Sequence, residues 1–221
     1  MATASNAQHR TPVVVVGPSA VIRWRTWVTK HPFGGAVAAG WIATWIATIF
    51  GIWFHGIGLP TLDWPTVNGA IVDPKGSIPV QFSIGGFLHY GDGIVFTIIF
   101  AIVIFPLLTR VLGRRMSPLS NMVKALIFAM ALATISAGFL VPYVYFPHAG
   151  ATLFATGYGW KLVFGIYLWH LAFGANLGLI YNPLPSVSQE AAVPEDPHRG
   201  PSAPERVLQG NVVETGSLSN V

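Results

Sequence analysis

Residues 84–108 read IGGFLHYGDGIVFTIIFAIVIFPLL, and Asp92 is the only Asp, Glu, Lys or Arg among them. An apolar run of about 20 residues is long enough to cross the hydrocarbon core of a bilayer as a helix. Three further apolar stretches approach or exceed this length: 34–55, 123–145 and 160–181. The sequence therefore predicts an all-α integral membrane protein, with a four-helix transmembrane bundle over residues 34–182.

The composition supports this class. Charged residues make up 9% of the 221 residues and hydrophobic residues 52%, whereas about a quarter of the residues in a soluble domain are charged. The net charge of +4 does not indicate a nucleic-acid partner, because the basic residues adjoin the apolar stretches and form no patch with interleaved aromatic side chains. The chain has no Cys, so a metal would be held by His, Asp, Glu or Met.

The basic residues predict how the helices cross the membrane. Three precede the first span and four lie in or beside the link between the second and third spans: Arg23, Arg25 and Lys30, then Arg110, Arg114, Arg115 and Lys124. Because Lys and Arg concentrate in cytoplasmic loops, both termini are expected in the cytoplasm. The loops 56–83 and 146–159 then face outward. Trp64 and four prolines predict an ordered segment in the first of these loops.

The two ends of the chain differ from the bundle. Residues 1–19 lack amphipathic periodicity, and residues 183–221 are rich in Pro, Ser, Gly and Glu and contain no aromatic residue. Such segments bury too little apolar surface to offset the entropy of ordering, so both are predicted to be disordered tails. Between the first tail and the bundle, residues 20–33 carry Trp24 and Trp27 among cations. This composition is typical of a segment at the headgroup level.

Small residues predict where the helices pack. They recur every three or four positions, which places them on one helix face and lets neighbouring helices approach closely. The glycines expected at these contacts are Gly40, Gly51, Gly93, Gly174 and Gly178. His89 and His170 each precede a glycine by four residues, and aligning the second and fourth spans on them suggests two similar helical hairpins. Chance similarity between glycine-rich helices is the alternative.

Ionisable side chains inside the spans are the candidate functional residues, because charged and titratable groups are costly in hydrocarbon. Five residues are expected in the outer half of the bundle or just beyond it: His89, Asp92, His170, His55 and His148. Imidazole and carboxylate are ligands of copper, zinc and iron, which makes this set a candidate metal site, with copper or a b-type haem as the cofactor. In the alternative interpretations the histidines hydrogen-bond neighbouring helices, or His89 pairs with Asp92 and the pair handles protons.

The pattern of small residues also resembles a known family. It comprises a first span rich in Gly, Ala and Thr, the outer segment GLPTLD at 58–63, His89 followed by Gly93, and WHLAFGANLGLIY at 169–181. Over residues 34–183 the chain resembles an uncharacterised family of small bacterial four-helix membrane proteins. The resemblance implies the fold and a place in the bacterial inner membrane, and it carries over no activity and no functional residue. The chain departs from that family in its long outer loop and its polar C-terminal segment.

A second resemblance is to the third subunit of copper-dependent membrane monooxygenases. The metal site of that family combines one Asp with two His of neighbouring helices. In this chain Asp92 follows His89 by three residues, whereas in that family a His follows the Asp by four.

Three functions are expected from these features. The first is a non-catalytic accessory subunit, packed against a membrane protein partner or a second copy of the chain. The second is a metal- or haem-binding redox component that uses the bundle histidines. The third is a small proton-linked transporter or channel in which Asp92 and His89 titrate. An enzyme acting on its own is not expected, because the sequence has no phosphate-binding loop, nucleophile elbow or zinc-protease motif.

Overall fold

The computed structural model describes residues 19–113, 116–146 and 152–185, and the elements formed there are all helices. The predicted tails and His148 lie outside these residues, apart from Ser19 and residues 183–185. Four helical spans are long and apolar enough to cross a membrane: Pro32–Ile57, Ile78–Val111, Pro118–Tyr145 and Trp160–Ile180. The predicted all-α membrane bundle is therefore confirmed.

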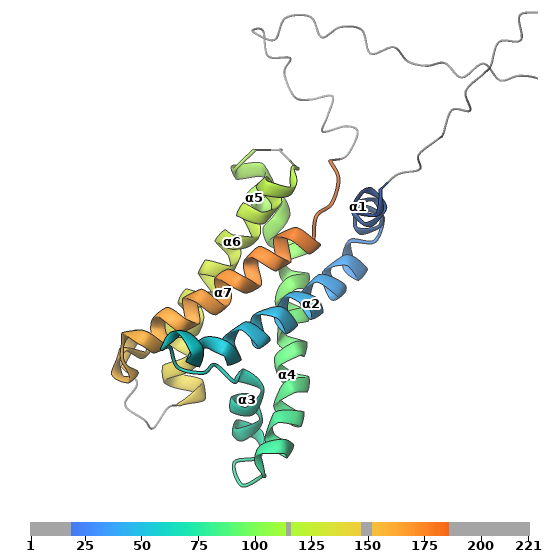
Figure 1. The fold of residues 1–221 in the computed structure, drawn as a ribbon. Helices are drawn as coiled ribbons and strands as arrows, with labels where there is room; N and C mark the ends of the chain where they lie inside the picture. Colours follow the sequence, from blue (N-terminus) through green and yellow to red (C-terminus); the bar gives the residue numbers. More distant parts are fainter. Residues whose placement is uncertain (1–18, 114–115, 147–151, 186–221) are drawn as a thin grey trace, which may run out of the picture. The chain divides into compact units, whose positions relative to one another are not determined.

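The bundle is a row of four helices: α4 (Ile78–Ile99), α2 (Pro32–Ile52), α7 (Trp160–Ile180) and α6 (Pro118–Ile135) (Figure 1). Each packs along the next one in this row. Within the described residues α4 and α6 form no extensive contact, and α6 meets this span through the π-helical turn Phe100–Ile104 and the following helix α5 (Phe105–Val111). The faces of α4 and α6 beyond that turn are therefore left to line an internal site.

The two ends of the bundle are distinguished by what covers them. At one end, named here the inner end after the predicted topology, α1 (Ala20–Lys30) contacts the end of α7. The Trp24 indole N–H donates to the Ile180 carbonyl over 2.8 Å, and the Arg25 guanidinium donates to the carbonyls of Met116, Asn182 and Pro183 over 2.8 to 3.3 Å. The Ile180 carbonyl belongs to the last turn of α7, which has no helical partner for it, and the other three carbonyls belong to residues just before α6 and just after α7. The predicted interfacial segment thus also links the start of α6 to the end of α7; we call this set of bonds the α1 clamp.

The outer end carries a helix that the sequence analysis did not identify as one. The segment α3 (Trp64–Val72) begins at Asp63, whose carboxylate accepts from the Thr66 backbone N–H over 3.2 Å. It packs along the first turns of α4, and the two backbones meet at Gly69 and Gly85. The expected ordered segment of the outer loop is this helix.

The second span is longer than predicted. It runs from Ile78 to Val111, 34 residues rather than the predicted 84–108, or about 50 Å of helix, whereas the hydrocarbon core is about 30 Å thick. The helix starts early because Ser77 precedes it and Pro79 occupies its first turn, where the missing N–H costs nothing. Its first turns carry Gln81 and Ser83, so hydropathy alone placed the start too late.

Two spans contain π-helical segments, and each has a proline nearby. The turn Phe100–Ile104 precedes Pro106, and the segment Ser136–Tyr145 contains Pro142. A proline has no N–H for the carbonyl four residues earlier and its ring crowds that carbonyl, which distorts the helix locally. The predicted uniform helices over 84–108 and 123–145 are corrected accordingly, and Ser136 and Tyr145 are carried by the widened segment.

Small and large residues divide the surface of α2 as expected in a bilayer. The buried face comprises Ala36, Ala39, Gly40, Ala43, Thr44, Ala47, Thr48 and Gly51. The opposite face exposes Trp41, Ile42, Trp45, Ile46, Ile49 and Phe50. Since lipid tails are as apolar as these side chains, close backbone packing rather than burial of bulk favours helix association in a membrane. Apolar helices of this kind indicate contact with membrane lipid.

Candidate functional site: a cavity between the spans

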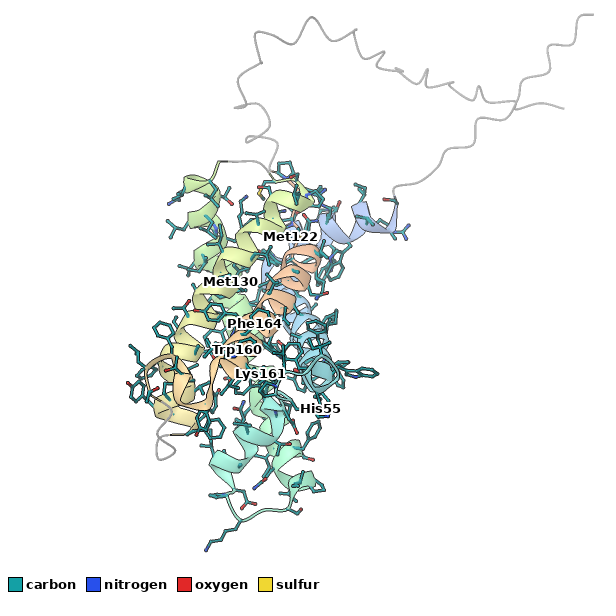
Figure 2. The ribbon with its side chains drawn as sticks, turned by 60° about the vertical axis from the view of Figure 1, so that its left-hand side comes forward. His55, Met122, Met130, Trp160, Lys161 and Phe164 are labelled. Carbon is teal, nitrogen blue, oxygen red and sulfur yellow. The ribbon has the colours of Figure 1, made fainter. Side chains whose placement is uncertain are left out.

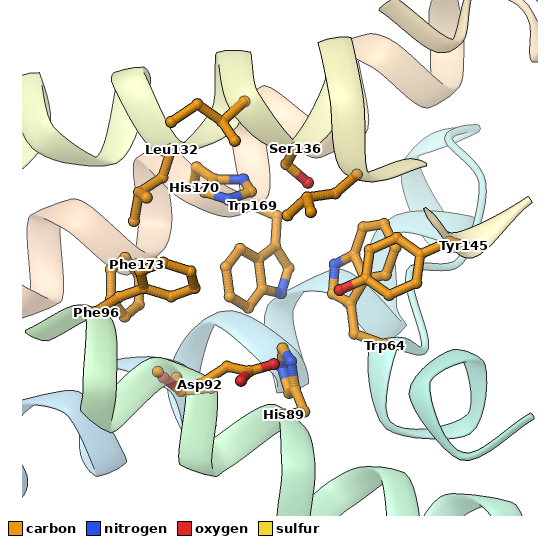
Figure 3. A pocket seen from close by; sticks show the side chains of 14 residues that line it. Trp64, His89, Asp92, Phe96, Leu132, Ser136, Tyr145, Trp169, His170 and Phe173 are labelled. Atoms are coloured by element: carbon orange, nitrogen blue, oxygen red, sulfur yellow. The ribbon is translucent and has the colours of Figure 1, made fainter. Parts of the chain in front are cut away.

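A cavity of about 120 Å³ lies between the faces that α4 and α6 leave free (Figure 3). We call it the central cavity. Its lining comprises Thr44 of α2, Trp64 of α3, His89, Asp92, Gly93 and Phe96 of α4, Leu132, Ile135, Ser136, Leu140 and Tyr145 of the third span, and Trp169, His170 and Phe173 of α7. The structure thus brings three of the five predicted site residues, His89, Asp92 and His170, to one place.

His89 is held by α2. Its Nε2 lies 3.0 Å from Thr48 Oγ1, and the Thr48 hydroxyl donates its proton to the Thr44 carbonyl over 2.7 Å. With that proton already used, the Thr48 oxygen acts as the acceptor and His89 donates through Nε2–H. In the neutral ring, Nδ1 of His89 then carries a lone pair.

His170 is held by its own helix. Its Nδ1 lies 2.8 Å from the Ile166 carbonyl oxygen, and because a carbonyl only accepts, the proton is on Nδ1. Nε2 of the neutral ring is therefore the lone-pair nitrogen, and within the described residues it has no hydrogen-bond partner. Each histidine is thus anchored through one ring nitrogen and retains the other as an acceptor.

Asp92 lies at the mouth of the central cavity, since it lines the cavity and is also exposed. The predicted His89–Asp92 pair does not form, because Nε2 of His89 is turned to Thr48 on α2. Among the described residues the Asp92 carboxylate makes no hydrogen bond or ion pair. A carboxylate within an apolar span is costly unless it meets a proton, a cation or water.

Trp169 occupies the middle of the lining, with His170 on one side and His89 and Asp92 on the other (Figure 3). Its ring centroid lies 5.5 Å from that of His89 and 5.0 Å from that of His170, and it stacks on Phe173 at 5.9 Å. Its Nε1–H is buried without a hydrogen-bond partner, as is Thr44 Oγ1. Buried polar groups are nearly always satisfied, so the cavity-lining indole N–H is a candidate donor to water or a ligand, whereas Thr44 Oγ1 packs against Gly93.

The predicted five-residue metal set is not assembled. His55 lies exposed in the short 3₁₀ turn Trp53–Ile57 and does not line the central cavity, while His148 is outside the described residues (Figure 2 labels His55). Within residues 19–113, 116–146 and 152–185, no three His, Cys, Asp or Glu side chains gather closely enough to hold a metal ion. His89 and His170 lie beside the indole of Trp169 instead, so the described residues do not offer the ligand set predicted for copper.

Several aromatic residues of the lining, among them Tyr145 and Trp169, were not predicted as site residues, and Trp64 was predicted only as part of the ordered outer segment. The rings of Trp64 and Tyr145 lie 5.6 Å apart and bring α3 against the end of the third span. Nothing in their spacing separates them from lipid-facing aromatic residues. Trp169 carried one usable signal, its place beside His170 on a buried face.

In comparisons of this chain with family models, with curated proteins and with solved structures, nothing matches. The resemblances stated from the sequence therefore remain predictions, and the function has to be argued from the central cavity.

Proposed function

We propose that this protein is a small proton-linked transporter or channel, and that the central cavity is its site. The observation that carries the proposal is the convergence of Asp92, His89 and His170 on one cavity inside the predicted membrane region. Ionisable residues within transmembrane segments are rare, face the interior of the bundle or a cavity, and mark ion and proton pathways. Both histidines keep one nitrogen that can accept a proton.

A purely structural role accounts for only part of the site. The bonds of His89 to Thr48 and of His170 to Ile166 are the contacts expected of histidines that stabilise a bundle. The same explanation does not reach Asp92 or Trp169 Nε1, which have no partner among the described residues. Their presence in a mostly apolar cavity with a few converging polar groups is typical of a ligand site.

Proton movement provides the direct test. Proteoliposomes loaded with a pH-sensitive dye are given an inside-negative potential, and acidification of the lumen is followed. We expect the wild type to exceed protein-free vesicles, and Asp92→Asn to lower the rate at least about tenfold, because a positioned proton acceptor typically contributes more than that. The wild-type rate matching that of protein-free vesicles would contradict the proposal.

The matched control is Asp73→Asn. Asp73 lies in the outer loop at the end of α3, outside the central cavity, and loses the same charge. We expect its flux to equal that of the wild type. An equal loss in both variants would show that the effect is one of surface charge and would also contradict the assignment of Asp92.

An accessory subunit is the second candidate, and one observation favours it. Asp92 is exposed beside the outward-facing Val95 and Ile99 of α4, so a helix of another protein, or of a second copy, would cover an unpartnered carboxylate. Native mass spectrometry of gently extracted protein tests this. A stoichiometric partner or dimer that Asp92→Asn releases and Asp73→Asn retains would support it, whereas a monomer in both variants would contradict it.

A further inference from the structure

The lining of the central cavity carries three groups that can accept a hydrogen bond from a ligand. They are the Asp92 carboxylate, which makes no bond to the described residues, and one ring nitrogen each of His89 and His170, left by the bonds described above. The Trp169 indole N–H only donates, and the hydroxyls of Thr44, Ser136 and Tyr145 in the same lining can donate or accept. The lining contains no Lys and no Arg, so no side chain of this cavity supplies a permanent positive charge to the carboxylate.

Aromatic rings form much of the remaining wall. Phe96, Trp169 and Phe173 line the cavity beside the polar groups, and Trp64 and Tyr145 line it at the outer end. The faces of aromatic rings carry negative potential and attract cations, most strongly where water is excluded. Carboxylate, imidazole lone pairs and ring faces all favour the same kind of ligand.

We infer that the central cavity binds a small organic amine in its protonated form, with the ammonium group at Asp92 and the apolar body against the aromatic wall. An ammonium is positively charged and only donates hydrogen bonds, which matches the Asp92 carboxylate, a group that has no partner among the described residues. A carboxylate held inside an apolar span gains most from a partner of opposite charge. The inference rests on the proposed function, because it assigns a solute to the same site.

The size of the cavity limits the apolar body to about one ring. The volume is about 120 Å³, somewhat less than the about 150 Å³ of an engineered cavity that admits benzene, so one ring is the upper limit and the ammonium group has to lie at the open mouth beside the exposed Asp92. Benzylamine fits this description and has a neutral analogue of nearly the same shape, benzyl alcohol. Comparing these two compounds separates the effect of the ligand's charge on binding from the effect of its apolar surface.

Binding to the full-length protein in nanodiscs of zwitterionic lipid tests the inference, with empty nanodiscs subtracted to remove partition into lipid. We expect the wild type to bind benzylamine at least about tenfold more tightly than benzyl alcohol, or 1.4 kcal/mol. Asp92→Asn should abolish that preference, while Asp92→Glu and Asp73→Asn should retain it. Equal affinity for the two compounds, no binding of benzylamine, or a preference that survives in Asp92→Asn would each overturn it.

The outcomes separate this inference from the transport proposal. Amine preference in a protein that moves no protons above protein-free vesicles would support the ligand class and contradict transport. Proton flux in a protein that shows no amine preference would support transport and overturn the ligand class. Asp92→Glu guards against a folding defect, because it keeps the charge while changing the shape at the same position.

Discussion

Replacing Gly178 with alanine is expected to destabilise the bundle by about 1–3 kcal/mol, the usual cost of forcing a methyl group into a packed contact. Gly178 lies where α7 crosses α6, and an added Cβ would collide with the backbone Cα of Met122 and contact the Cβ of Ala125 at 3.0 Å. A backbone atom cannot rotate away as a flexible side chain can. Thermal unfolding of the detergent-solubilised protein, followed by loss of its monodisperse gel-filtration peak, measures the effect.

Gly165→Ala is the control on the same helix. Gly165 is also buried, but an added Cβ there would meet Leu62 and Phe54 only at 3.6 to 3.8 Å, which is ordinary van der Waals contact. Alanine is also the better helix former, by up to about 1 kcal/mol. We expect this variant to be as stable as the wild type or more so. If both variants lose stability equally, the close α6–α7 approach is not what holds the bundle together.

Removing the guanidinium of Arg25 is expected to cost about 2 kcal/mol, since hydrogen bonds to charged groups contribute about 1.5–3 kcal/mol and this side chain is only half-buried. Arg25→Ala leaves the carbonyls of Met116 and Asn182 without this donor, while the Pro183 carbonyl still accepts from Asn121 Nδ2 over 3.5 Å. Limited proteolysis should then cut the chain near α1 or after α7 sooner than in the wild type.

Arg23 is the control that separates the loss of the Arg25 hydrogen bonds from the loss of one positive charge. Arg23 is exposed on the same helix, and none of the described hydrogen bonds involves its side chain, so Arg23→Ala should keep wild-type resistance to protease. Arg25→Lys should restore only part of it, because an ammonium cannot reproduce the planar fork that reaches three carbonyls. If Arg23→Ala and Arg25→Ala are equally sensitive to protease, the proposed role of the Arg25 hydrogen bonds in the α1 clamp is contradicted.

The number of spans could be predicted because the length of an apolar run is set by the bilayer itself. The ends of the spans could not be predicted. Gln81 and Ser83 lower the hydropathy of the first turns of α4, which lie outside the predicted span 84–108 and are covered by α3. The π-helical segments could not be predicted either, because they depend on how the neighbouring helices accommodate Pro106 and Pro142. Arg25 was read only as a topology signal, because nothing local shows that three distant carbonyls surround it.

Part of the candidate site could be predicted, because the depth of a polar residue within an apolar span can be estimated from the sequence. His89, Asp92 and His170 stand out because each is polar within an apolar run, and all three line the central cavity. His55 does not line the cavity with them, because the turn that ends the first span exposes this side chain. The hydrogen-bond partner of His89 could not be predicted either, because Thr48 belongs to another helix and lies 41 residues away in the sequence.

The central claim is that an accessible cavity, mostly apolar but lined by ionisable groups, lies between α4 and the third span, and cysteine labelling tests it most directly. The chain has no Cys, so a single thiol can be placed at Ser136, which lines the cavity and differs from Cys by one atom. The thiolate attacks the sulfur of a thiosulfonate reagent, forms a mixed disulfide and releases the sulfinate, and the thiolate itself forms where water reaches. Ala137→Cys is the control, because Ala137 is 0% exposed and does not line the cavity.

We predict that Ser136→Cys reacts with a trimethylammonium-bearing methanethiosulfonate faster than with its sulfonate-bearing analogue, that benzylamine slows the reaction, and that Ala137→Cys stays unmodified. If Ser136→Cys reacts with neither reagent, or no faster than Ala137→Cys, the cavity is closed to water and to ligands, and the account is contradicted.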